Sequence, residues 1–152
     1  SAGKGESNRK AFKKRVADGP PPGLIAYAGR TPIGWIAIGP RASLPRLNNS
    51  RILAPVDEQP VWSVSCFFVT KEWRKRGVSV FLIEAAARFA AKAGAKLVEG
   101  YPVVARGTAP APFVWTGLPG TFLEAGFEEV ARRSTTRPIM RRAVTKAMSK
   151  GK

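Results

Sequence analysis

The sequence predicts a mixed α/β domain with a mostly antiparallel sheet, a central parallel strand pair joined by a βαβ crossover, and helices on both faces. Three observations support this prediction. A strand-like segment at 61–69 precedes the clearest helical pattern, at 78–93, and a second strand-like segment follows at 96–101. This order is typical of a βαβ unit, whose two strands are parallel. Hairpin patterns at 24–38 and 127–142 add antiparallel strands on either side.

The first half of the chain predicts a helix, a hairpin and a long connection. Residues 6–18 have the pattern of a modest amphipathic helix, with Phe12 and Val16 on one side. Strands at 24–28 and 33–38, separated by a Gly-Arg-Thr-Pro turn, predict a β-hairpin. Residues 41–59 have weak periodicity and several prolines, so we interpret them as irregular.

The central βαβ unit has the strongest patterns. In the strand at 61–69, alternation predicts one face formed by Val64, Cys66 and Phe68. Apolar residues from Val78 to Ala93 recur at helical spacing, and the glycine at position 94 favours a left-handed end to this helix.

The last part of the chain predicts a short helix at 119–125 and a terminal hairpin. The hairpin strands are expected at 127–133 and 137–142, with a Ser-Thr-Thr turn between them. Short Pro- and Gly-rich segments at 19–23 and 107–112 are interpreted as loops within one domain.

Length and composition favour a single folded domain. The chain has 152 residues, 44% of them hydrophobic, which suffices for one core and not for two ordinary domains. We therefore interpret residues 1–152 as one domain, with residues 1–8 and 143–152 as flexible basic tails. No apolar run is long enough to span a bilayer, so no membrane partner is expected.

Cysteine and histidine usage excludes several kinds of chemistry. A single cysteine, Cys66, has no partner for an internal disulfide and fits a reducing compartment, so we expect a cytoplasmic protein. The chain has no histidine, which excludes Ser-His-Asp, Cys-His and His-ligated zinc mechanisms. No metal cofactor is expected. The formal net charge of +16, from 26 Lys and Arg against 10 Asp and Glu, favours anionic partners.

The turn at 74–79, Arg-Lys-Arg-Gly-Val-Ser, is the candidate binding segment. It lies between a strand and the start of the strong helix, where backbone N–H groups, the positive end of the helix dipole and cationic side chains can hold a pyrophosphate. Gly77 allows a phosphate to approach the backbone closely. The alternative is an ordinary basic turn with a glycine at the helix entry. Neither a P-loop nor a GxGxxG fingerprint is present.

The segment 69–79, Val-Thr-Lys-Glu-Trp-Arg-Lys-Arg-Gly-Val-Ser, resembles the acyl-CoA-binding motif of the GNAT superfamily of N-acetyltransferases. That motif is Gln/Arg-x-x-Gly-x-Gly/Ala; Arg74 and Gly77 match it, and Ser79 stands where Gly or Ala is usual. The segment 122–127 resembles the family's late helix, which ends in Gly-Phe. The similarity covers about residues 24–142, and the family's first strand has no visible counterpart.

The resemblance implies an acetyl-CoA-dependent acyltransferase that moves an acetyl group to a primary amine by direct attack in a ternary complex. The parallel strands should splay apart to admit the thioester, and a backbone N–H near Phe68 should stabilise the oxyanion. The residues implied in cofactor binding are Phe68 and Val69 for the pantetheine arm and Arg74, Lys75, Arg76, Gly77, Val78 and Ser79 for the pyrophosphate.

The catalytic acid and base are less clear from the sequence. Glu99, near the end of the strand after the helix, is the first choice for a general base, with a salt-bridged structural carboxylate as the alternative. Asp57 and Glu58 are further candidates for the base. Phe122 stands in the slot of the family's frequent tyrosine acid, so Tyr101 is the candidate acid, with a structural tyrosine as the alternative.

Cys66 is interpreted as a structural residue of the cofactor strand, because most strand cysteines are inert. The loop at 113–117 is a candidate wall of the acceptor pocket. The acceptor is expected to be a small-molecule or peptide amine, and a homodimer is compatible with the sequence.

Two rival functions are also compatible with the sequence. One is a GNAT-like binding module whose basic surface contacts nucleic acid or the ribosome, and the other is a catalytically inactive acyl-CoA sensor. The aromatic residues lie mostly in predicted strands rather than between Lys and Arg, which disfavours nucleic acid. The Arg74–Gly77 match favours a cofactor site.

Overall fold

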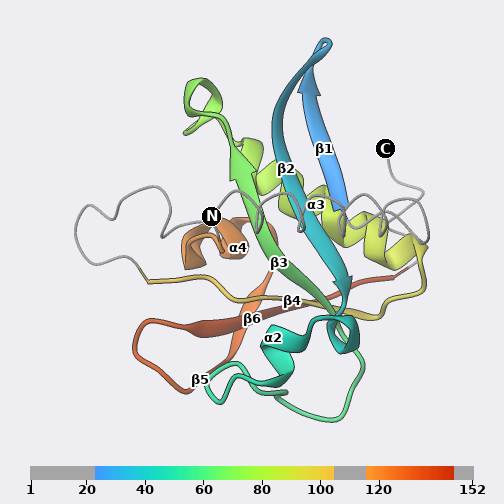
Figure 1. Cartoon of the computed structure of the whole chain (residues 1–152), viewed down its shortest axis with the longest axis vertical. Coiled ribbons are helices and arrows are strands. Elements are labelled where there is room, and N and C mark those ends of the chain that lie inside the picture. Colours follow the sequence, from blue (N-terminus) through green and yellow to red (C-terminus); the bar gives the residue numbers. More distant parts are fainter. Residues whose placement is uncertain (1–22, 105–115, 146–152) are drawn as a thin grey trace, which may run out of the picture.

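The computed structural model describes residues 23–104 and 116–145, which form one six-stranded sheet flanked by helices (Figure 1). The strand order in the sheet is β1-β2-β3-β4-β6-β5. The strands are β1 (Gly23–Ala28), β2 (Thr31–Pro40), β3 (Trp62–Val69), β4 (Leu97–Gly100), β5 (Glu128–Arg132) and β6 (Pro138–Ala143). The helices are α2 (Pro45–Asn48), α3 (Val78–Lys92) and α4 (Pro119–Glu124), with one-turn 3-10 helices η1 (Arg41–Ser43) and η2 (Lys71–Trp73).

The predicted fold class is confirmed. β3 and β4 are parallel and are joined by α3, while the other neighbouring strands pair antiparallel. Both predicted hairpins are present, and Gly94 ends α3 with a left-handed φ of 102°. The predicted helix at 6–18 and the chain ends 1–8 and 146–152 lie outside the described residues.

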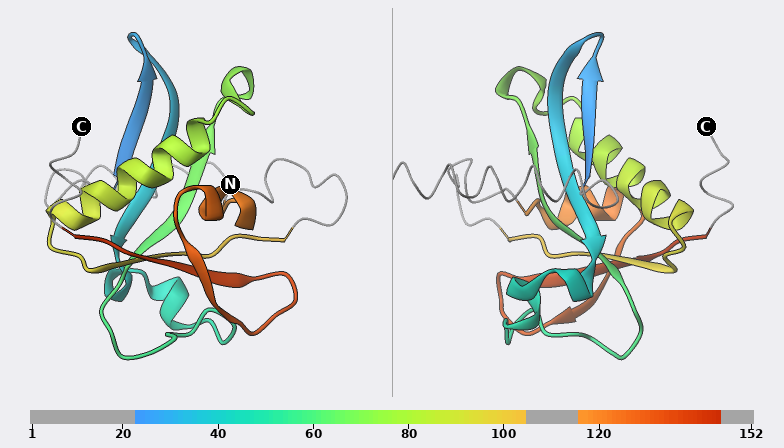
Figure 2. Two further views of the ribbon diagram at one scale, coloured as in Figure 1. Left: turned by 180° about the vertical axis from the view of Figure 1, so that it is seen from behind. Right: turned by 45° about the vertical axis from the view of Figure 1, so that its right-hand side comes forward.

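Helices α3 and α4 cover one face of the sheet, and α2 lies on the other (Figure 2). The main core forms between α3 and the sheet, because α3 presents one continuous apolar face. Its buried residues are Val78, Leu82, Ile83, Ala86, Ala87, Ala90 and Ala91. Many of these are alanines, so the helix can pack closely against the strands. None of the helices in the described part of the chain is long and apolar enough to cross a membrane.

The connection from β2 to β3 differs from the prediction. We expected residues 41–59 to be irregular, yet η1 and α2 form there. Both are about one turn long, too short to produce a helical period in the sequence. Pro45 occupies the first helical position of α2, where its missing N–H costs nothing. A second small core under this connection contains Leu53, Tyr101 and Ile139.

The predicted alternation along β3 is wrong beyond its middle. Val64 is in the core as one face requires, but the next core residues are Phe67 and Val69 rather than Cys66 and Phe68. The register explains this: Ile38 pairs with Val64 and Ala37 with Cys66, so Ser65 is an extra residue in a β-bulge. A bulge shifts the side chains that follow to the opposite face.

Order also extends past the expected start of the C-terminal tail at residue 143. Ala143 is the last residue of β6, and Val144 is buried. The backbone N–H of Val144 donates to the carbonyl of Lys96 at 2.9 Å. The end of the sheet is therefore tied to the residue that precedes β4.

Candidate functional site

The parallel strands β3 and β4 pair over a short stretch and then separate. Their ladder has three residue pairs and ends at Val64 and Gly100. Beyond this point β3 continues to Val69 beside β2, and the two parallel strands diverge in the ribbon (Figure 1). The bulge at Ser65 coincides with the end of the ladder. Bulges are frequent next to active sites, where they redirect side chains.

The chain that follows β4 is held on both edges by other segments. The N–H of Val103 donates to the carbonyl of Gly117 at 2.9 Å, and the N–H of Val104 donates to the carbonyl of Thr136 at 2.8 Å. Successive N–H groups of an extended chain point to opposite edges. The segment that precedes α4 therefore lies on one edge of this chain, and the β5–β6 turn lies on the other.

The turn before α3 has the open geometry expected of an anion cradle. Gly77 is the N-cap of α3 with a left-handed φ of 81°, and no side chain caps this end. The first helical hydrogen bond runs from Phe81 N–H to the Gly77 carbonyl at 3.0 Å, so the preceding N–H groups have no partner within the helix. A Cβ added at Gly77 would meet no atom of the described residues within 4 Å. Lys75 also has a left-handed φ, of 62°.

The cationic side chains of this turn contact the neighbouring strand and turn. Arg74 Nε donates to the carbonyl of Val69 at 3.1 Å, and its guanidinium lies 5.6 Å from the centre of the Phe68 ring. The Arg76 guanidinium lies 5.0 Å from the centre of the Trp73 ring. Arg74 therefore fixes the end of β3 relative to the turn.

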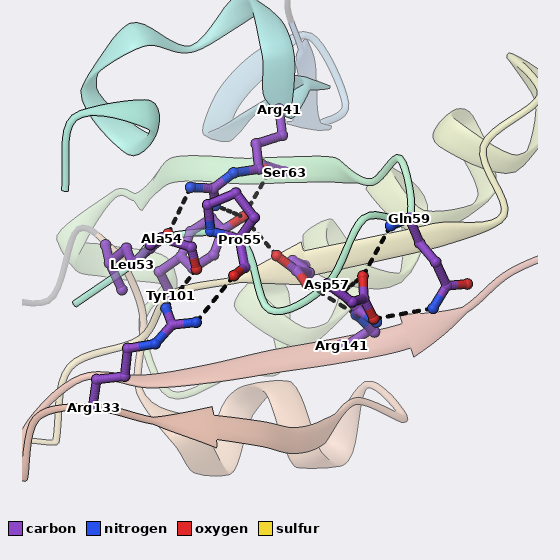
Figure 3. Close-up of polar contacts among 11 residues, drawn as sticks. Arg41, Leu53, Ala54, Pro55, Asp57, Gln59, Ser63, Tyr101, Arg133 and Arg141 are labelled. Carbon is purple, nitrogen blue, oxygen red and sulfur yellow. Dashed lines mark hydrogen bonds and ion pairs between the residues drawn. The ribbon is translucent and has the colours of Figure 1, made fainter. Parts of the chain in front are cut away.

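On the face opposite α3, a buried polar network surrounds Tyr101 (Figure 3). The Tyr101 hydroxyl donates to Glu99 at 3.0 Å, accepts from Arg41 at 3.1 Å and lies 2.6 Å from the Ser63 hydroxyl. Arg41 also donates to the carbonyls of Leu47 and Leu53. The network thus ties the β2–β3 connection to both parallel strands.

Glu99 is the centre of a second set of contacts with Arg141. The carboxylate of Glu99 is 1% exposed and accepts two hydrogen bonds from Arg141, at 2.9 and 2.6 Å. Arg141 also donates to the exposed Asp57 at 2.7 and 3.2 Å. The hydrogen bonds from Arg141 lower the pKa of Asp57 to about 2. One arginine therefore joins a buried carboxylate to an exposed one.

The structure brings Glu99 and Tyr101, the candidate base and acid, into direct contact. Each makes the contacts of its structural alternative: Glu99 is ion-paired, and Tyr101 is buried with its hydroxyl fully bonded. Burial, and then the charge of Glu99, raises the pKa of Tyr101 to about 12. Arg41 and Arg141 were missed from the sequence, because they lie 60 and 42 positions from the residues they hold.

Phe122 and Cys66 have surroundings that fit structural roles. Phe122 is fully buried and packs edge-on against Phe67 and Phe127. It fills the space left by Gly100, where an added Cβ would come within 2.1 Å of its ring. Burial raises the pKa of the Cys66 thiol, which disfavours the reactive thiolate. Residues 113–115 of the candidate pocket wall lie outside the described residues.

Between residues 23 and 104 and between 116 and 145, no three His, Cys, Asp or Glu side chains cluster as metal ligands would. Asp57 and Glu58, the further candidates for a base, lie in the β2–β3 connection. Both are exposed, and Asp57 is held by Arg141 and by Gln59.

Comparisons with known proteins agree with this architecture. A sequence model of the acetyltransferase (GNAT) family matches residues 2–104. The fold is similar to a ribosomal-protein-alanine N-acetyltransferase from Brucella melitensis, with a TM-score of 0.58 and 16% identity over 91% of this chain and 78% of that one. It is also similar to an aminoglycoside N(6')-acetyltransferase from Legionella pneumophila, with a TM-score of 0.55 and 18% identity over 97% and 78%. No curated protein sequence matches this chain.

Proposed function

The chain belongs to the acetyltransferase (GNAT) family, and on this basis we propose that it transfers an acetyl group from acetyl-CoA to a primary amine. The observation that carries the proposal is the open, glycine-capped N-terminus of α3 next to the end of β3, the strand that has separated from β4 after Val64. A cofactor with a pyrophosphate and an extended arm needs an anion cradle and an adjacent strand end, and the two features lie next to each other here.

We assign the pyrophosphate to the N–H groups of residues 74–79. A helix N-terminus attracts anions through its N–H groups and its dipole. The open space at Gly77 fits such a ligand, because no described residue fills the position that a side chain would take. The assigned residues are Arg74, Lys75, Arg76, Gly77, Val78 and Ser79.

The end of β3 is assigned to the pantetheine arm, through backbone groups of Phe68 and Val69. This strand end lies next to the cradle, and Arg74 connects the two. The Val69 carbonyl already accepts a hydrogen bond from Arg74. The arm would therefore share that carbonyl with Arg74 or use the other backbone groups of the strand end.

In the proposed reaction the acceptor nitrogen forms a bond to the acetyl carbon and the carbon–sulfur bond of the thioester breaks. Acetyl-CoA supplies an activated acyl group, and the proton lost by the amine balances the charge of the released thiolate. A backbone N–H near Phe68 is the proposed donor to the oxyanion.

We assign Glu99 and Tyr101 to positioning rather than to direct proton transfer. Glu99 is bound to Arg141 and Tyr101, and a tyrosine with a pKa of about 12 holds its proton too firmly to be an efficient acid near neutral pH. The amine would then lose its proton to solvent, so the rate should rise with pH through the pKa of the amine itself.

Calorimetric titration with acetyl-CoA tests the cofactor site. Gly77→Glu places a bulky negative charge in the cradle and should abolish the binding seen with the wild-type chain. Gly94→Glu is the matched control: Gly94 is also left-handed, also has open space around it and lies at the other end of the same helix. It should bind as the wild type does.

Absence of acetyl-CoA binding by the folded wild-type chain would overturn the proposal. The same result would favour the rival function, a binding module whose affinity for nucleic acid should fall steeply with salt concentration. Binding of acetyl-CoA without transfer to any amine would instead support the inactive sensor.

A further inference from the structure

Arg137 lies beside the end of β4 on the side of the β5–β6 turn. Its Nη2 donates to the carbonyl of Tyr101 at 3.1 Å, and the neighbouring Thr136 carbonyl accepts the N–H of Val104. Extending the β4–β6 register from Gly100 and Met140 places Arg137 opposite Val103. The guanidinium is therefore held at the point where β4 has separated from β3.

The charge of Arg137 has no counter-charge in the described part of the chain. The ion pairs there involve Arg132 and Arg141 and not Arg137. Its Nε is buried and has no hydrogen-bond partner, and burial lowers the pKa of the guanidinium. A half-buried cation with an unpaired N–H lowers the stability of the folded chain unless an anion binds to it.

The neighbouring arginines differ in how far the protein satisfies them, and Arg41 also has a buried Nε without a partner among the described residues. Arg141 is matched by Glu99 and Asp57, and Arg41 spends its charge on two carbonyls and the Tyr101 hydroxyl. Together with Arg137 these are three cations against two carboxylates. Among the described residues neither Arg41 nor Arg137 has a carboxylate partner, but Arg41 donates to three oxygens and Arg137 to one.

A second unsatisfied polar atom lies on the other edge of the same chain segment. The buried Thr116 hydroxyl has no hydrogen-bond partner among residues 23–104 and 116–145. Its neighbour Gly117 accepts the N–H of Val103, which places Thr116 close to the end of β4. The two unpartnered groups thus flank residues 101–104, a guanidinium N–H on one edge and a hydroxyl on the other.

We infer that Arg137 binds a carboxylate on the acceptor, so that the acceptor is a small amine that also carries a carboxylate. This inference rests on the proposed function. The planar guanidinium matches a carboxylate with two parallel hydrogen bonds, and Nε is one of the donors such a pair uses. Phosphate sites in proteins usually combine hydrogen-bond donors from several residues, whereas the site proposed here has the guanidinium of Arg137 alone.

The test uses pairs of amines that differ in the carboxylate alone: alanine and alaninamide, and phenylalanine and phenylalaninamide. Release of CoA from acetyl-CoA gives kcat/KM for each amine with the wild type, with Arg137→Gln and with the control Arg88→Gln. Arg88 is half-exposed on α3, on the other face of the sheet. It controls for the loss of one positive charge.

For each pair of amines, kcat/KM for the acid is divided by kcat/KM for the amide. This ratio should be about tenfold or more higher in the wild type and in Arg88→Gln than in Arg137→Gln, and the change should lie mainly in KM. The amide also has a lower amine pKa, so the deciding quantity is how the acid-to-amide ratio changes between wild type and variant. An equal ratio in the wild type and Arg137→Gln would overturn the inference while leaving the acetyltransferase proposal intact.

Binding of the same amines, followed by NMR titration without acetyl-CoA, separates the two proposals. Acid-selective binding that Arg137→Gln removes, in a chain that acetylates nothing, would support the carboxylate site and contradict the enzyme. If neither titration nor kinetics shows a preference that depends on Arg137, the carboxylate site is wrong.

Discussion

The two ends of the parallel strand pair differ in how they are completed. At the paired end, Ser63 and Glu99 face each other across the ladder. The Tyr101 hydroxyl contacts both side chains, Arg141 binds Glu99, and Arg41 donates to the Tyr101 hydroxyl. At the separated end, β3 leads to the turn around Gly77, where the N-terminus of α3 has no capping side chain. One end is closed by the protein's own side chains, and the other leaves backbone donors exposed.

Binding and stability are therefore divided between the two ends of the strand pair. Buried charges at the paired end are costly unless every partner is present, so changes there should lower the stability of the folded protein. Open N–H groups at the separated end cost little in water, so changes there should affect the ligand first. Substitutions at the two ends test this division.

The largest effect is expected from Arg141→Ala at the paired end. The substitution leaves the Glu99 carboxylate buried without its cation, which should lower the free energy of unfolding by about 3–5 kcal/mol. Urea denaturation measures this loss. A second change, Glu99→Gln in the same chain, should restore part of it by removing the unpaired charge.

Arg132→Ala is the matched control for that experiment. Arg132 pairs with Glu129, but both side chains are well exposed, at 38% and 43%. Exposed pairs contribute little, so the loss should stay below about 1 kcal/mol. Equal losses in the free energy of unfolding for Arg141→Ala and Arg132→Ala would show that the buried ion pair between Arg141 and Glu99 contributes no more than an exposed one.

The contrast between the two ends also marks what the sequence could predict. The turn at 74–79 is a local pattern between a strand and a helix, so its position could be predicted from adjacent residues. Phe122 in the place of a tyrosine was likewise visible. The partners of Glu99 and Tyr101 come from residues 41, 63 and 141, which only the folded sheet brings together.

The bulge in β3 was hidden for a different reason. Strand alternation in the sequence carries no mark of an inserted residue when both neighbours are small or apolar, as Val64 and Cys66 are beside Ser65. Arg137 was not identified either, because it was one cation among many. Its missing counter-charge is visible only from the contacts of the folded chain.

An intermediate effect is expected from Tyr101→Phe. Loss of the hydroxyl leaves Arg41, Ser63 and Glu99 each without one contact, at a cost of about 1–3 kcal/mol near neutral pH. Because folding raises the pKa of Tyr101 from 10 to about 12, the wild type loses stability as pH rises through this interval. The variant has no such group.

The stability gap between wild type and Tyr101→Phe should therefore be constant up to about pH 10 and narrow towards pH 12. Urea unfolding at a series of alkaline pH values measures it. A gap that stays unchanged over this range would mean that the hydroxyl titrates as it does in the unfolded chain, and that the network does not bury it.

The smallest effect is expected from Asp57→Asn, at the exposed edge of the same network. Folding lowers the pKa of Asp57 from 3.8 to about 2, so its contribution is present above pH 3.8 and is lost as pH falls towards 2. The variant should be slightly less stable than the wild type at neutral pH and equal to it near pH 2. Glu58→Gln, which removes the same charge from the next exposed residue, should show no such convergence. If the stability of Glu58→Gln also converges with that of the wild type near pH 2, the effect comes from the net charge of the chain and not from the contact of Asp57 with Arg141.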